Sequence, residues 1–490
     1  MTGTTSKGAQ APAMKQYLHE KATYHDALLF FRMGDFYELF FDDALTAAKA
    51  LDLTLTSRNK NEPDSIPMCG VPHHAAQTYV AKLLEQGYKV AICEQLEDPA
   101  KAKGVVKRGV VRVLTPALVL DEESLDARAN QFLAAALPPE GGAEMPGSWA
   151  LAAYDLSTGE LFTTEVSDAL GLAGELARLD VRELICPSSS EGFVRAQVRV
   201  LPRLFVRGAA ALSAKDATEV LARAVGESEL RASLEGVSVA SRTAAALALR
   251  YATESQPGKA LPVQRIGRLD VKDHLHVDET TQQHLEIFRS VRGEKRGTLL
   301  AHLDATVTPM GGRRLRTWLA FPLQDTRRIR KRHDAVDALV TYPDVRQRLR
   351  ESLGKVPDLE RIVIRASLGA ATPRDLGQLR DGLACVPEVV GALTSQSDAA
   401  DALKPLIVQD VCAELFAMLR GSLADAPPPA LEDGGVFRQG FDAELDRYTE
   451  LATNGRNVIL ELEQKERERT KINSLKVRYN RVFGYYIEVT

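Results

Sequence analysis

Two side chains two residues apart, Phe36 and Glu38, could together test the pairing of a DNA base step. They belong to the segment Gly34-Asp35-Phe36-Tyr37-Glu38, in which Gly34 lets the backbone turn and approach a ligand closely. An exposed aromatic ring can wedge into the minor groove for roughly a few kcal/mol per step, and mispaired sites deform more cheaply. A neighbouring carboxylate is repelled by phosphates and is favourable only where a base edge offers a donor. The segment therefore predicts a sensor of weak base pairing.

The same segment has a second interpretation, as ordinary local structure at a strand-to-helix junction. Asp35 would be the N-cap of a helix, and Glu38, three residues later, would complete a capping box. Phe36 would then be a packed core residue. The exposure of the Phe36 ring decides between the two interpretations.

Hydrophobic periodicity indicates which elements position this segment. It predicts a small mixed α/β domain over residues 14–120. The expected elements are a strand at 28–31, a helix at 40–51, a strand at 51–56, a helix at 79–86 closed by Gly87, and a strand at 90–92.

The rest of the chain divides into further regions. Residues 1–13 are predicted to be a disordered tail, and 125–262 a second α/β domain with two strands joined by a turn between Trp149 and Val166. Residues 265–435 are rich in Leu, Ala and Arg at helical spacing, which predicts a helical body. A further helix and a β-hairpin are expected in 436–490. The fold class is therefore multidomain, α/β plus α.

Two groups of basic residues could contact phosphate. The first lies in the acid-free stretch between Asp98 and Asp121, and the second in the C-terminal hairpin. Sequence-independent phosphate binding suits the hairpin group, whereas the first group is more typical of a solvated face. The groups are Lys101, Lys103, Lys107, Arg108 and Arg112, and Lys471, Lys476, Arg478 and Arg481.

Composition excludes several classes of protein. The chain has 490 residues, 45% hydrophobic and 26% charged, as expected for a multidomain globular protein. A net charge of −4 argues against a uniformly basic nucleic-acid-binding surface. The five dispersed cysteines form no C-x-x-C pair, which fits a reducing compartment. With no signal-peptide pattern and no apolar run near the roughly 20 residues that span a bilayer, we expect a cytoplasmic protein.

Several motifs resemble the MutS family of DNA mismatch repair proteins. Residues 34–38 match the family's mismatch-sensing motif, and the resemblance continues along nearly all of the chain. His284 stands where the family usually shows Asn, which casts little doubt on function. The other similar segments are 67–75 beside the sensing motif, 278–287, 297–300 and 303–316 in the helical core, and the C-terminal hairpin, which resembles part of the family's clamp.

The resemblance implies DNA contacts at matching positions. Phe36 would stack on the mispaired base and Glu38 would hydrogen-bond to it. Gly34, Met68 and His74 would belong to the same mismatch-binding site. Contacts to the DNA backbone are implied for Arg58, Lys60, Lys471, Lys476, Arg478 and Asn480.

The resemblance also implies partners and cofactors. The expected ligand is double-stranded DNA with mismatches or small loops. The full-length family protein is a homodimer that signals to a downstream repair protein of the MutL type, and it is an ATPase that uses ATP and Mg²⁺ in a C-terminal module. This chain contains no G-x-x-x-x-G-K-[ST] loop, so we expect no cofactor and no catalysis here. A nucleoid-associated cytoplasmic location follows from the DNA ligand.

Two alternative functions stay open at this point. Asp155 lies on the first strand of a hairpin that resembles the RNase H-like connector domain of the family. In an RNase H-like nuclease this carboxylate would bind Mg²⁺ with other carboxylates, although a structural aspartate is the interpretation we favour. The second alternative is a non-sensing scaffold that uses the connector and the lever helices for protein contacts alone. The intact Phe36 and Glu38 pair argues against it.

Overall fold

The computed structural model describes two compact units. Unit 1 comprises Met1–Ala371 and Pro387–Val408, and unit 2 comprises Thr372–Val386 and Gln409–Thr490. The described residues are 11–58, 65–97, 104–120, 124–139, 147–226, 236–269, 273–396, 400–453, 455–480 and 484–489. One boundary between the units falls at Pro387, inside helix α15 (Pro373–Thr394), where proline cannot donate the helical hydrogen bond.

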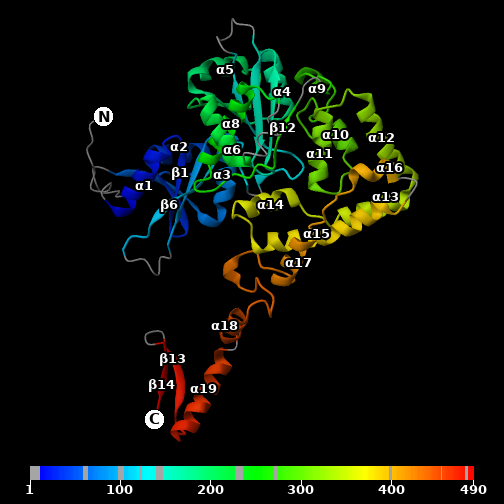
Figure 1. Ribbon diagram of the computed structural model, residues 1–490. Coiled ribbons are helices and arrows are strands. Elements are labelled where there is room, and N and C mark those ends of the chain that lie inside the picture. The colour runs from blue at the N-terminus through cyan, green and yellow to red at the C-terminus, as the bar shows by residue number, and fades with distance from the viewer. Residues whose placement is uncertain are drawn as a thin grey trace. The chain divides into compact units, whose positions relative to one another are not determined.

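The first domain of unit 1 is a mixed sheet covered by helices on both faces (Figure 1). Its strand order is β3-β4-β2-β1-β5-β6, with β1 antiparallel to β2 and parallel to β5. Helices α2 and α3 cover one face, and α1 covers part of the other. The bounds are α1 Pro12–Thr23, β1 Leu28–Met33, β2 Phe36–Phe40, α2 Phe41–Leu51, β3 Thr56–Arg58, β4 Ile66–Pro72, η2 His73–Ala75, α3 Ala76–Glu85, β5 Val90–Gln95 and β6 Arg108–Leu114.

The segment that carries Phe36 and Glu38 is a strand and not the start of a helix. Tyr37 and Leu39 are buried against α2 and α3, whereas Phe36 is exposed, which is the period-two alternation of a strand. Gly34, with φ +62°, forms the turn between β1 and β2. The capping-box interpretation of Asp35 and Glu38 is therefore wrong.

The predicted strand over residues 51–56 is also wrong. Helix α2 continues to Leu51 and ends at Asp52, whose left-handed backbone (φ 54°) terminates it. The strand begins only at Thr56. Alternating Leu and Thr side chains here follow a helix end and do not form a strand. The helices predicted over 40–51 and 79–86 and the strands over 28–31 and 90–92 are confirmed as α2, α3, β1 and β5.

The second domain is another mixed sheet, with the order β11-β10-β7-β8-β9-β12. The alanine-rich helix α8 packs with α6 on one face, and α4 and α5 pack on the other (Figure 1). The predicted hairpin between Trp149 and Val166 is confirmed as β8 and β9. The bounds are β7 Phe132–Leu137, β8 Trp149–Asp155, β9 Glu160–Val166, α4 Ala169–Arg178, β10 Glu183–Pro187, η4 Ser188–Ser190, α5 Glu191–Gln197, β11 Phe205–Ala209, α6 Ala214–Val225, α8 Val239–Glu254 and β12 Arg265–Arg268.

A helical body follows, as the Leu, Ala and Arg pattern predicts. Residues 265–268, the first four of the predicted helical region 265–435, differ from that expectation. They form strand β12, which pairs in parallel with β9 and extends the second sheet. None of the helices in the described ranges combines the length and apolarity needed to cross a bilayer. The bounds are α9 Glu279–His284, α10 Leu299–Leu303, α11 Pro309–Ala320, α12 Thr326–Thr341, α13 Pro343–Leu353, α14 Leu359–Ser367, α16 Ala400–Leu403 and η7 Lys404–Leu406.

Unit 2 ends in the predicted β-hairpin. Strand β13 pairs antiparallel with β14, and α19 packs beside it, where Glu463 accepts a hydrogen bond from the Val477 amide at 2.9 Å. At the other end of the unit, Arg380 of α15 donates to the Ala424 and Asp425 carbonyls at 2.7 and 2.8 Å. The bounds are α17 Ala413–Ser422, η8 Leu431–Asp433, α18 Ala443–Thr453, α19 Gly455–Thr470, β13 Lys476–Asn480 and β14 Gly484–Glu488.

Candidate nucleic-acid interface

The Phe36 ring lies on the surface, with 47% of the residue exposed. It occupies the first position of β2, on the same sheet face as Phe40 and Glu38. Phe40 is covered by Tyr17 of α1, with ring centroids 5.1 Å apart, and Tyr17 covers Phe31 in the same way at 5.6 Å. Helix α1 therefore seals one end of this face, and Phe36 projects beyond the sealed part.

Glu38 is half-buried between two arginines on the same face. Burial raises the pKa of this carboxyl, while the positive charges of Arg58 and Arg108 act in the opposite direction and offset part of the effect. The residue opposite in β4 is Gly70, where a Cβ would lie 3.2 Å from the Tyr37 carbonyl oxygen and 3.6 Å from Glu38 Cγ. The absence of a side chain at Gly70 leaves Glu38 room on the sheet face.

Sequence reasoning missed Arg108 as part of this site. Its guanidinium lies over the Phe31 ring, 5.4 Å from the centroid, and its Nε donates to the Arg32 carbonyl at 2.7 Å. Arg58 lies similarly over Phe40 at 5.9 Å, so the two charges flank Glu38. The only sequence signal for Arg108 was that it belongs to a basic stretch. Lys101 and Lys103 of that stretch lie outside the described residues, and so does Lys60, a separate candidate for contact with the DNA backbone.

The remaining first-domain candidates lie around this surface. Met68 is partly buried and pairs with Phe40 across β2 and β4. The His73 amide donates to the Asp35 carbonyl at 2.8 Å, which ties the start of η2 to the turn before Phe36. His74 follows on η2 and is exposed. The structure therefore places Gly34, Phe36 and His74 near the start of β2, with Glu38 two residues further along the strand. Met68 lies beside Phe40 at the other end of β2, toward the part of the face that α1 covers.

Four candidates for DNA backbone contact lie in unit 2. Lys471 and Lys476 are exposed, and Lys471 has a left-handed backbone with φ 58°. Arg478 Nε is bound to Glu488 Oε2 across the hairpin at 2.7 Å, so part of its charge is neutralised within the protein. Asn480 is the last residue of β13. Lys476 and Arg478 share one strand face, as the alternation in the sequence predicts.

Comparison with known proteins identifies the family. A model of MutS domain I matches residues 11–123, MutS domain II matches 131–263, and MutS domain III matches 280–481. A curated "DNA mismatch repair protein MutS" from Sorangium cellulosum is 46% identical over 98% of this chain and 56% of the relative. Proteins of the same name from Anaeromyxobacter sp. (strain K) and Myxococcus xanthus are 46% and 42% identical, over 98% and 100% of this chain and 54% of each relative. The chain belongs to the MutS family.

The chain spans about half the length of the curated relatives it matches. The match to MutS domain I contains the first sheet and the Phe36 surface, and the match to domain II contains β7 to α8. The match to domain III contains most of the helical body and reaches the hairpin of unit 2. The sequence-based resemblance to this family is confirmed.

Asp155, on which the nuclease alternative depends, is fully buried in this MutS-family chain. Its carboxylate accepts hydrogen bonds from Ser157 N at 2.8 Å, Ser157 Oγ at 2.7 Å, Asn130 Nδ2 at 2.9 Å and Gln131 N at 3.2 Å. Four donors on two oxygens are typical of a structural carboxylate. Across the described ranges, no group of three or more His, Cys, Asp or Glu residues is placed to hold a metal ion. Nothing in these residues favours a nuclease.

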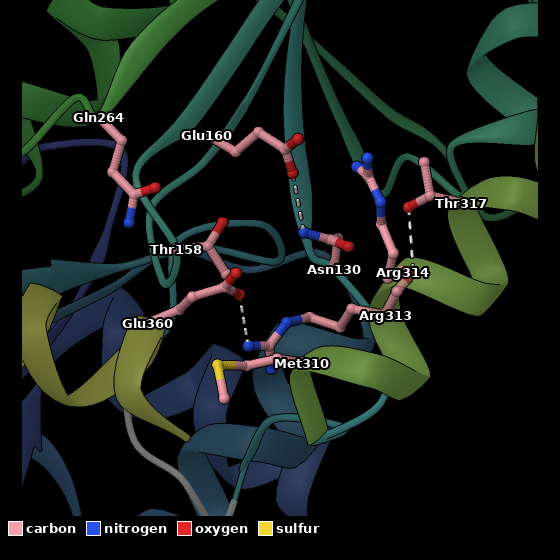
Figure 2. Close-up of a pocket in the computed structure, with 9 residues that line it drawn as sticks. All are labelled: Asn130, Thr158, Glu160, Gln264, Met310, Arg313, Arg314, Thr317 and Glu360. Carbon is pink, nitrogen blue, oxygen red and sulfur yellow. Dashed lines mark hydrogen bonds and ion pairs between the residues drawn. The ribbon is translucent and has the colours of Figure 1, made fainter. Parts of the chain in front are cut away.

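A small cavity of about 150 Å³ lies beside Asn130, between the second sheet and α11 (Figure 2). The Asn130 amide donates to Glu160 at 3.4 Å, and Arg313 donates to Glu360 at 2.7 Å. Each carboxylate that lines the cavity therefore has a donor within the protein. This arrangement is typical of a polar contact between packed elements inside the protein.

Proposed function

We propose that this chain binds double-stranded DNA that contains mispaired bases or small loops. Phe36 is the wedge that enters at the base step, and Glu38 accepts a hydrogen bond from the loosened base. The observation that carries the proposal is the exposed Phe36 ring on the same strand face as Glu38. The printed name of the relatives, DNA mismatch repair protein MutS, supports it. A non-sensing scaffold has no need of an exposed ring paired with a carboxylate.

The charges around the wedge suit discrimination between duplexes. Arg58 and Arg108 attract the phosphates on either side, whereas Glu38 repels them and adds to the energy of every complex in which no base donor is available. Gly34, Met68 and His74 form the rim of the mismatch-binding site. Contacts to the DNA backbone are proposed for Arg58, Lys60, Lys471, Lys476, Arg478 and Asn480. The ion pair with Glu488 weakens the contribution of Arg478 relative to Lys476.

For the full-length protein we propose further functions, and these proposals rest only on the membership of this chain in the MutS family. We propose that the second sheet is an RNase H-like connector, that the helical body contains lever helices, and that the hairpin is part of a clamp. The full-length protein is proposed to be a homodimer that binds ATP and Mg²⁺ and signals to a MutL-type partner. Its proposed location is the cytoplasm, at the nucleoid. These statements rest on the matches to MutS domains I, II and III.

Fluorescence polarisation with G·T and G·C duplexes at pH 5.5 to 8 tests the proposal on wild type and Glu38→Gln. Wild type should prefer G·T at pH 8. As the pH falls, Glu38 should protonate at a higher pH than an ordinary glutamate, because burial raises its pKa, and G·C binding should tighten. Glu38→Gln should bind G·C about fivefold more tightly at pH 8, since a like-charge contact near 4 Å in water is worth roughly 1 kcal/mol.

The difference between the two proteins isolates Glu38 from other groups that titrate in this range. Asp52→Asn is the matched control, because Asp52 is exposed in the same domain and ends α2 away from the sensing face. It should change neither the G·T to G·C ratio nor its pH dependence. Equal affinity of wild type for both duplexes would contradict the proposed function. An unchanged ratio in Glu38→Gln would contradict the role of the carboxylate.

A further inference from the structure

A second cleft of unit 1 lies far along the chain from the Phe36 surface. It has a volume of about 460 Å³ and is lined by α4, the residues 200–204 before β11, α9, the loop 288–293 and Arg316 of α11. Small-molecule sites in proteins usually measure roughly 300–1,000 Å³, so this cleft is large enough for a ligand. The smaller cavity near Asn130 is separate from it.

The floor of this cleft is apolar and continuous with the core of the second domain. Leu176 is buried in that core, and Leu201, Leu204 and Phe288 pack against it while lining the cleft. Val200, with 59% of the residue exposed, extends the apolar wall toward solvent. Because the floor belongs to a packed cluster, the cleft is preformed and offers a rigid apolar surface.

The rim of the cleft carries more positive than negative charge. Its arginines are Arg182, Arg203, Arg289 and Arg316, whereas its carboxylates are only Asp180 and Glu279. The residues that line the cleft therefore carry an excess of two positive charges.

The carboxylate of Asp180 forms ion pairs with three of these guanidinium groups. Asp180 lies 3.4 Å from Arg316, 3.7 Å from Arg289 and 3.9 Å from Arg182. Burial lowers the pKa of Arg316, and the neighbouring Arg289 and Arg182 add to that effect, although Asp180 and Asp126 oppose it. The Arg316 guanidinium also covers the Phe288 ring, 4.7 Å from its centroid. A rim with more positive than negative charge thus borders the apolar floor.

We propose that this cleft binds a small organic phosphate whose phosphoryl group is attached to a flat apolar ring. A phosphate monoester carries about −1.5 to −2 charges at neutral pH, which matches the excess of two positive charges. Its oxygens accept hydrogen bonds from the paired N–H groups of arginine, and the ring lies on Leu201 and Leu204, beside the part of Phe288 that lines the cleft. The site contains none of the residues proposed to contact DNA. A test of ligand binding here is therefore independent of a test of the proposed function.

Isothermal titration of the 490-residue chain with 1-naphthyl phosphate tests this proposal, with 1-naphthol and inorganic phosphate as partial ligands. One saturable site is expected for 1-naphthyl phosphate. Each partial ligand should bind at least about tenfold more weakly, because each lacks either the charged or the apolar contact.

Two variants locate the site. Arg289→Gln should weaken 1-naphthyl phosphate binding about tenfold or more, since it removes a charge-assisted hydrogen bond to the phosphoryl group. Arg296→Gln is the matched control, because Arg296 is exposed in the same loop region and does not line the cleft. Val200→Asp places a negative charge on the exposed wall and should also weaken binding, at a position where a polar side chain does not disturb the core.

The proposal would be overturned by the absence of saturable binding, by equal binding of inorganic phosphate alone, by unchanged affinity in Arg289→Gln, or by an equal loss in Arg296→Gln. Self-association that Arg289→Gln abolishes, without binding of 1-naphthyl phosphate, would show that a second copy occupies the cleft and would likewise overturn it.

Discussion

Phe36→Ala is expected to remove most of the preference of this chain for a G·T duplex over a G·C duplex. The exposed ring can stack on a base, and base–aromatic stacking contributes roughly 1–3 kcal/mol, or about 5- to 150-fold in affinity. A perfect duplex resists unstacking, so its affinity depends mainly on phosphate contacts and should change little. The loss should therefore fall almost entirely on the mismatched duplex.

Fluorescence polarisation on the 490-residue chain measures this effect, with circular dichroism to verify folding. Phe36→Leu keeps an apolar wedge without an aromatic face and should retain part of the discrimination. Leu45→Ala is the matched control, because Leu45 is also 47% exposed but lies on α2, which covers the opposite sheet face. A G·T to G·C ratio in Phe36→Ala that equals the wild-type ratio would refute the wedge assignment.

The local elements of the first domain were largely predictable, because burial imposes a period on the sequence. Helix α2 and strands β1 and β5 follow directly from their apolar spacing. The turn at Gly34-Asp35 was ambiguous, since a glycine followed by an aspartate suits both a hairpin turn and a helix N-cap. Burial of Tyr37 and Leu39 against the α2 side resolves the ambiguity, and that burial depends on packing that the local sequence does not contain.

The environment of Glu38 depends on strand order and was not predictable from the sequence. Arg108 is 70 residues away along the chain and reaches this face only because β5 lies between β1 and β6. The parallel pairing of β1 with β5 is a long-range contact for which no local motif exists. The sequence therefore indicated the aromatic wedge and the carboxylate, but it did not indicate Arg108, whose positive charge opposes the rise in the pKa of Glu38.

The different environments of the adjacent residues Arg313 and Arg314, near the start of α11, also depend on long-range packing and could not be predicted from the sequence. Both line the cavity in Figure 2, but only Arg313 is buried. Arg313 donates to both oxygens of Asp358 at 2.6 and 2.7 Å and to Glu360 at 2.7 Å. Burial lowers its pKa, and these carboxylates outweigh burial, so the net pKa is raised. Arg314 is exposed and lies 5.8 Å from the Trp318 ring centroid.

Arg313→Met is therefore expected to destabilise the contact between α11 and α14 by roughly 3–5 kcal/mol, because it leaves Asp358 buried without its main partner. Arg314→Met loses only an exposed cation–π contact, which contributes at most about 1 kcal/mol. Hydrogen–deuterium exchange of peptides from α11 and α14 measures the local opening free energy and suits a multidomain chain that does not unfold in two states. Equal protection in the two variants would mean that the Arg313–Asp358 pair does not hold this junction, whatever its geometry.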